Sequence, residues 1–206
     1  MTANVDLSAE IAAERSALAD VLAALPATAW DEPTLCAGWR VREVVAHVTM
    51  PFRYPMARFL AELARSGGRF DRMSDRCARR DSAVGSEVLL AAVRDNVRHP
   101  WQPPGGGLAG ALTHDVIHGL DITVALGVGR SVPAERLHIV LAGLTEPKVI
   151  KHFGADLGGV ELTATDLDWS FGTGTPVSGA AQDLALLLCG RKLPAGRLES
   201  ASTRFS

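Results

Sequence analysis

Hydrophobic residues recur at helical spacing through the first 130 residues of the chain. Apolar side chains return every three or four positions from Leu7 to Leu25, after which Pro26 ends the pattern. The same spacing appears in the run Val41, Val44, Val45 and Val48, and it continues over residues 86–98 and 108–126. Four amphipathic helices joined by short connections predict an antiparallel four-helix bundle.

Two parts of this region depart from the simple pattern. Pro51 and Pro55 predict that the second helix kinks or restarts before residues 56–68. Residues 69–85 are basic and polar, and we assign no helix to them. Most of the arginines between residues 65 and 80 are expected on a solvated face, with binding of an anionic cofactor or substrate as the alternative.

The pattern changes after Gly129. Residues 132–154 read as a helical stretch that Pro147 can break, and residues 160–174 alternate like a strand, a tight turn and a second strand. A short apolar helix closed by Gly190 follows, and residues 201–206 could form a last strand. We therefore predict a mainly α protein, with a four-helix bundle over residues 1–130 and a small α/β appendage over residues 131–206.

Composition narrows the classes of protein. The 206 residues are 47% hydrophobic and 21% charged, which is enough for a substantial core and argues against disorder. The net charge of −2 argues against a nucleic-acid surface that works by bulk charge. No apolar run reaches the ~18 residues of a membrane span, and the first residues lack the basic start of a signal peptide. Three cysteines without CxxC spacing favour a reducing compartment, so we expect a cytoplasmic protein.

The candidate chemistry lies in the stretch LTHDVIHGLDITVALG. His114 and His118 are four residues apart, so on a helix their side chains project from the same side and can bind one ion. Zinc is the metal that we expect, with nickel or iron(II) as alternatives. Asp121 is placed to accept a hydrogen bond from a ligating imidazole. His47, beside the apolar stripe of the second helix, is the best-placed third ligand, and the alternative for it is a half-buried structural histidine.

Several segments resemble a known family. PTLCAGWRVREVVAHV, LTHDVIHGLDITVALG, ELTATDLDWSFGTG and VSGAAQDLALLLCGR are similar to the maleylpyruvate isomerase-like, mycothiol-dependent proteins, in the order expected for them. That family belongs to the DinB-like metal-binding bundles. The resemblance implies a DinB-like bundle, a metal held by His47, His114 and His118, and the small-molecule thiol mycothiol as cofactor.

The chain also departs from the family pattern. A Ser or Thr usually caps the second helix, but Arg40 stands there, so we expect Glu43 to lack its capping-box partner. The C-terminal part is expected to be shorter than in the isomerase itself.

Arg191 is a candidate anion-binding residue, where the appendage of the family reaches toward the bundle. Cys36 is expected to be a small buried residue, because no histidine is near it in sequence.

Three functions follow from these residues. An open position on zinc could activate mycothiol for transfer to a small electrophile, or for isomerisation of that electrophile. The same position could hold water and support hydrolysis. The third possibility is a metal- or ligand-binding protein without turnover. The resemblance favours the thiol chemistry, and the expected partners are small molecules, with a homodimer as the assembly to consider.

Overall fold

The computed structural model describes residues 5–200 of the chain, which form two compact units, Met1–Ile122 and Thr123–Ser206. The boundary near residue 130 that the sequence suggests stays a prediction. Each unit is described by itself below.

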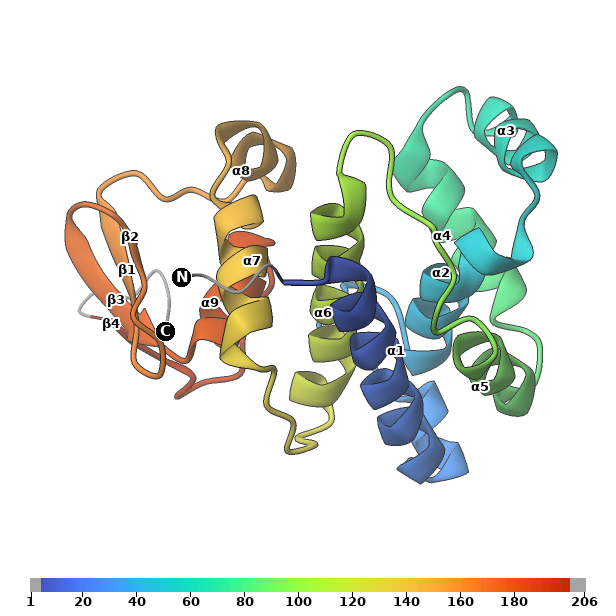
Figure 1. Ribbon diagram of the computed structural model, residues 1–206, viewed down its shortest axis with the longest axis horizontal. Helices are drawn as coiled ribbons and strands as arrows, with labels where there is room; N and C mark the ends of the chain where they lie inside the picture. Colours follow the sequence, from blue (N-terminus) through green and yellow to red (C-terminus); the bar gives the residue numbers. More distant parts are fainter. Residues whose placement is uncertain (1–4, 201–206) are drawn as a thin grey trace. The chain divides into compact units, whose positions relative to one another are not determined.

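The first unit is helical (Figure 1). Helix α2 packs against α4 and α5, α1 packs against α5, and α3 packs against α4. The helices that the sequence predicts over residues 7–25, 86–98 and 108–126, and those around residues 41–48 and 56–68, are all present, with ends that differ by a few residues. The elements of this unit are α1 (Leu7–Ala24), η1 (Ala27–Asp31), α2 (Val41–Arg53), α3 (Met56–Arg65), α4 (Phe70–Asp81), α5 (Ser86–Arg94) and α6 (Gly107–Ala125), whose last three residues belong to the second unit.

Helix α1 shows how local sequence sets an element. The Asp6 side chain accepts hydrogen bonds from the backbone N–H groups of Ser8 and Ala9, which satisfies two donors at the helix start. Leu18 and Leu22, one turn apart, are buried, and their face packs into the unit. The helix ends at Ala24, two residues before Pro26.

Helix α4 is the element that the sequence analysis missed. Its arginines dominate the composition, but Met73 and Cys77 are four residues apart and buried, which is the spacing of one apolar helix face. They form a cluster with Met50 and Tyr54 of the α2 end. Pro51 lies inside α2, which continues to Arg53, and a new helix, α3, starts at Met56 after Pro55, so the predicted restart before residue 56 is present.

The second unit places a sheet against helices. The sheet order is β2-β1-β3-β4, with β1 parallel to β3 and the two outer pairs antiparallel. Figure 1 shows α7 and α9 on the same side of this sheet, and α9 contacts β1 and β3. The elements are α7 (Ala134–Leu144), α8 (Pro147–Phe153), β1 (Val160–Ala164), β2 (Ser170–Gly172), β3 (Thr175–Gly179), α9 (Ala181–Leu188) and β4 (Leu198–Ser200).

Three expectations for this unit can be compared with the structure. Pro147 does interrupt the helical stretch, since α8 begins at this residue. Strand β3 was not predicted, because Pro176 argues against an inner strand. The strand expected over residues 201–206 lies outside the described residues. Within residues 5–200, no helix has both the length and the apolar character that crossing a membrane requires.

Candidate metal centre

Three histidines from two helices meet in the first unit. His47 of α2 lies beside His114 and His118 of α6, and one potential ligand atom from each lies within 4.8 Å of the others. The Nε2 atoms of His47 and His114 are 3.1 Å apart. His47 is buried, and the other two are partly buried. The structure thus brings together the three residues that the sequence singled out as metal ligands, while their binding of a metal stays a prediction.

Each imidazole has a polar partner at its other ring nitrogen. The Nδ1 atom of His47 is 2.9 Å from the Ser74 hydroxyl, a residue of α4. Nδ1 of His114 is 3.0 Å from the Asp115 carboxylate, and Nδ1 of His118 is 3.0 Å from the Asp121 carboxylate. A carboxylate only accepts, so these two rings carry their proton on Nδ1, which leaves the Nε2 lone pair for another atom. The predicted contact between Asp121 and a ligating histidine is present.

Asp115 is itself anchored, which the sequence analysis did not foresee. Its second oxygen accepts a hydrogen bond of 2.7 Å from Arg15 Nε, and both side chains are fully buried. Arg15 also donates to the carbonyl oxygen of His99 and stacks over the ring of Phe52. A buried ion pair of this kind fixes the carboxylate, and through it the plane of the His114 ring. The only sequence signal is an arginine on α1, 100 positions away from Asp115.

The arrangement suits a tetrahedral metal such as zinc. Two nitrogens each bound at 2.0–2.1 Å to a tetrahedral zinc lie about 3.3 Å apart, close to the separation of His47 and His114 Nε2. A second set of potential ligands consists of Cys36, His118 and Asp121. We favour the three histidines, because Asp121 already accepts from the Nδ1 atom of His118.

The position of Cys36 corrects one expectation. The cysteine is half-buried, and its sulfur lies within 4.8 Å of potential ligand atoms of His118 and Asp121. The loop that carries it is tied to α6 by a hydrogen bond from the Leu35 backbone N–H to the Asp121 carbonyl oxygen. Cys36 is therefore close to His118 in the fold, although the two residues are far apart in the sequence. It is not the isolated buried residue that the sequence suggested.

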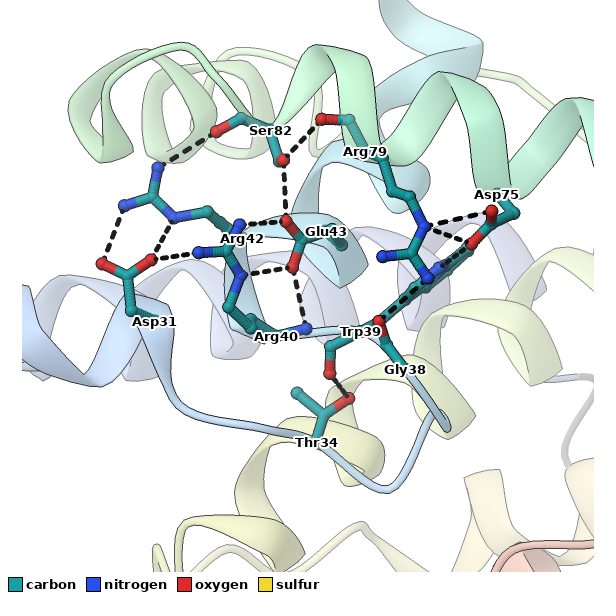
Figure 2. Close-up of polar contacts among 10 residues, drawn as sticks. All are labelled: Asp31, Thr34, Gly38, Trp39, Arg40, Arg42, Glu43, Asp75, Arg79 and Ser82. Carbon is teal, nitrogen blue, oxygen red and sulfur yellow. Dashed lines mark hydrogen bonds and ion pairs between the residues drawn. The ribbon is translucent and has the colours of Figure 1, made fainter.

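The start of α2 corrects another expectation (Figure 2). The Glu43 carboxylate accepts the backbone N–H of Arg40 at 2.8 Å, and the Arg40 guanidinium and the Ser82 hydroxyl also donate to it. Burial would raise the pKa of Glu43, but these hydrogen bonds outweigh it and hold the pKa below its usual value. The charged side chain of Arg40 is thus the partner of Glu43 at the start of α2, in place of a capping serine or threonine.

The loop before α2 places an indole beside the site. Trp39 is buried, its ring centroid lies 5.1 Å from that of His47, and its Nε1 donates to Asp75. The preceding residue, Gly38, has φ of +80°, a left-handed conformation that favours glycine. An added Cβ at Gly38 would also meet the Arg79 guanidinium at 3.3 Å. Gly38 and Trp39 of the CAGW segment therefore pack at the α2 end of the site (Figure 2).

The arginines between residues 65 and 80 are mostly paired. Arg65, Arg76 and Arg80 contact the buried carboxylate of Glu62, and Arg79 pairs with Asp75. These contacts form a charge network around α4.

Arg191 belongs to the second unit, where it lines a cavity of about 240 Å³ together with Asp156 and donates to the carbonyl oxygen of Cys189. Anion binding by Arg191 stays a prediction.

Comparison with known proteins connects this geometry to a family. Residues 11–102 match the model of the mycothiol maleylpyruvate isomerase N-terminal domain. The matched residues cover most of the first unit and end before α6. The match includes His47, and the resemblance found in the sequence is confirmed. No curated protein sequence matches the chain.

Two solved structures share the fold of the whole chain. The mycothiol-dependent maleylpyruvate isomerase aligns with a TM-score of 0.60, and a histidine-to-alanine variant of it aligns with a TM-score of 0.65. Both are 14% identical, and the alignments cover 95% of this chain and 92% of theirs. The alignments thus extend over both units, and the expectation of a shorter C-terminal part stays a prediction. The predicted fold class, a helical bundle with a small α/β appendage, is confirmed.

Proposed function

We propose that this protein is a metal-dependent enzyme that uses mycothiol to modify a small electrophile. The observation that carries the proposal is the convergence of His47, His114 and His118, each oriented through its Nδ1 atom by a hydrogen-bond partner. The choice of mycothiol as the thiol rests on the match to the mycothiol maleylpyruvate isomerase N-terminal domain.

The residues of this chain provide the site. Neutral imidazoles from His47, His114 and His118 would hold a divalent metal, and Ser74, Asp115 and Asp121 keep the three rings oriented. Zinc held by three neutral ligands would offer an open coordination position, where a thiol loses its proton near neutral pH. Trp39 packs beside His47 on the α2 side of the cluster, with ring centroids 5.1 Å apart.

Mycothiol would contribute a sulfur nucleophile for either of two outcomes. It would supply the thiol for transfer to the electrophile, or for reversible addition that isomerises the electrophile. Neither outcome needs an oxidant or a reductant, so the metal only has to stabilise charge.

The arrangement gives less support to hydrolysis. Glu43 is the glutamate that the sequence offers as a general base, but its carboxylate is occupied by Arg40 and Ser82 at the start of α2. A base must reach the water that it activates. We therefore place thiol chemistry ahead of hydrolysis and of metal binding without turnover.

The test is metal content and thiol-dependent turnover of three untagged proteins. We expect about one zinc or nickel ion per wild-type chain, loss of the ion in His118→Ala, and full occupancy in His138→Ala, which changes an exposed histidine outside the cluster. Turnover should require mycothiol and follow metal content. A wild-type protein that stays metal-free after incubation with zinc, nickel or iron(II) would refute the metal site, whereas metal without thiol-dependent turnover would indicate a binding protein.

A further inference from the structure

An apolar cavity adjoins the histidine cluster. It has a volume of about 440 Å³, and His47 and His114 form part of its wall. Most of the remaining wall is hydrophobic, including Met50, Phe59 and Trp101. Two more of its residues, Met56 and Phe70, are 69% and 48% exposed, so they lie where the cavity meets solvent. A small molecule bound here would thus have one end at the histidines and its body among hydrophobic side chains.

No aspartate, glutamate, lysine or arginine lines this cavity in the described part of the chain. The arginines that contact the wall residue Tyr54 are not part of this lining: Arg53 and Arg80 pair with Asp81, and Arg58 stacks over the Tyr54 ring at 3.9 Å. The Tyr54 hydroxyl, which belongs to the wall, also donates to Asp81. Away from a metal at the histidines, a carboxylate on the body of the ligand would therefore leave water without gaining a cationic partner in this lining.

The imidazole of His99, also in the wall, does not change this picture. Burial, together with the positive charge of Arg15, lowers the pKa of His99, so the ring is neutral at pH 7. Its Nδ1 atom accepts the backbone N–H of Trp101. Apart from a metal at the histidines, the wall therefore differs from one that recognises an anionic group, which needs fixed positive charge or several free donors.

We propose that the electrophile handled at this site is a neutral molecule with an aromatic or branched aliphatic group that fills the cavity. Its reactive carbon would face His47 and His114. This inference rests on the proposed function for the chemistry, but not for the shape and charge of the cavity. A neutral substrate differs from the dicarboxylate that the name of the structural neighbours would suggest.

The first test is binding of an unreactive pair of ligands to the zinc-loaded full chain. The ligands are 4-phenylbutan-2-one and its para-carboxylate, which share the ketone and ring and differ in charge. By isothermal titration, we expect the neutral ketone to bind at least about ten-fold more tightly, because the carboxylate loses its hydration without compensation. Equal or tighter binding of the carboxylate overturns the inference.

Two variants of α3 localise the binding. Met56→Lys places a cation at the cavity wall and should reduce the difference between the two ligands. Leu60→Lys adds the same charge to the same helix at a position that is 55% exposed and outside the cavity wall, and it should leave the difference unchanged. An equal effect of both lysines would mean that the ligands bind elsewhere and would also overturn the inference.

The final measurement separates this inference from the proposed function. The unsaturated pair, 4-phenylbut-3-en-2-one and its para-carboxylate, is supplied with mycothiol and the rate of thiol loss is recorded. Selective binding of the neutral ketone without mycothiol-dependent turnover supports the cavity and refutes the proposed function. Turnover of the carboxylate in preference to the neutral compound supports the proposed function and refutes the neutral substrate class.

Discussion

The carboxylate of Asp115 is bound on one oxygen by the buried guanidinium of Arg15 at 2.7 Å. The other oxygen of Asp115 faces Nδ1 of His114. The ion pair thus links α1 to a proposed metal ligand on α6, and it gives a residue with no role in ligand binding a direct influence on the site.

Replacement of Asp115 by asparagine should destabilise the apo protein strongly. The variant leaves the Arg15 charge buried without its counter-charge, and we expect a loss of about 3–5 kcal/mol in the free energy of unfolding. Urea denaturation in the presence of a chelator measures it. Asp20→Asn, at an exposed position of α1, is the control and should change little. A loss below about 1 kcal/mol for Asp115→Asn would show that the pair is not a source of stability.

Ser74→Ala should weaken metal binding with little effect on the fold. The variant removes the partner of His47 Nδ1, and loss of such a contact lowers metal affinity by about 10-fold or more. Competition with a chromophoric chelator measures the affinity. Ser66→Ala is a matched control, because Ser66 is also buried but its hydroxyl has no hydrogen-bond partner among the described residues. Equal affinities of wild type and Ser74→Ala would remove this serine from the site.

Glu43→Gln should destabilise the protein at neutral pH but not in acid. The pKa of Glu43 is lowered in the folded state, so its charge stabilises the fold above the unfolded pKa of about 4.3, and this contribution disappears as pH falls through the folded pKa. We expect a deficit of about 1–3 kcal/mol at pH 7 that narrows below pH ~4. Denaturation at several pH values tests this, with Glu32→Gln, at an exposed position, as the control. A deficit that does not depend on pH would contradict the charge argument.

Gly38→Ala should lower thermal stability. Alanine at φ of +80° costs about 1–2 kcal/mol, and its Cβ would approach the Arg79 guanidinium. For a protein of this size we expect the unfolding midpoint to fall by about 2–8 °C. Gly85→Ala is the control, since an added Cβ there meets no atom within 4 Å and its φ is negative. Equal midpoints for the two variants would show that the loop adapts freely.

The sequence predicted the elements whose signal is local. The four-residue spacing of His114 and His118 and the apolar stripe beside His47 are both periodic patterns, and they correctly placed these residues on α6 and α2. Ser74 and Arg15 could not be found this way, because their role arises only when α4 and α1 pack in the fold. Helix α4 was missed because its narrow apolar stripe, with Met73 and Cys77, is hidden among arginines.

The hydrogen bonds at Nδ1 of His47, His114 and His118 have a consequence for how the site would be loaded. These contacts involve no metal, so an incoming ion would meet a preformed set of donors. Exchange of one divalent ion for another should then proceed at the site itself, without unfolding of the helices. The identity of the ion in the cell would accordingly follow metal supply as well as the preference of three imidazoles.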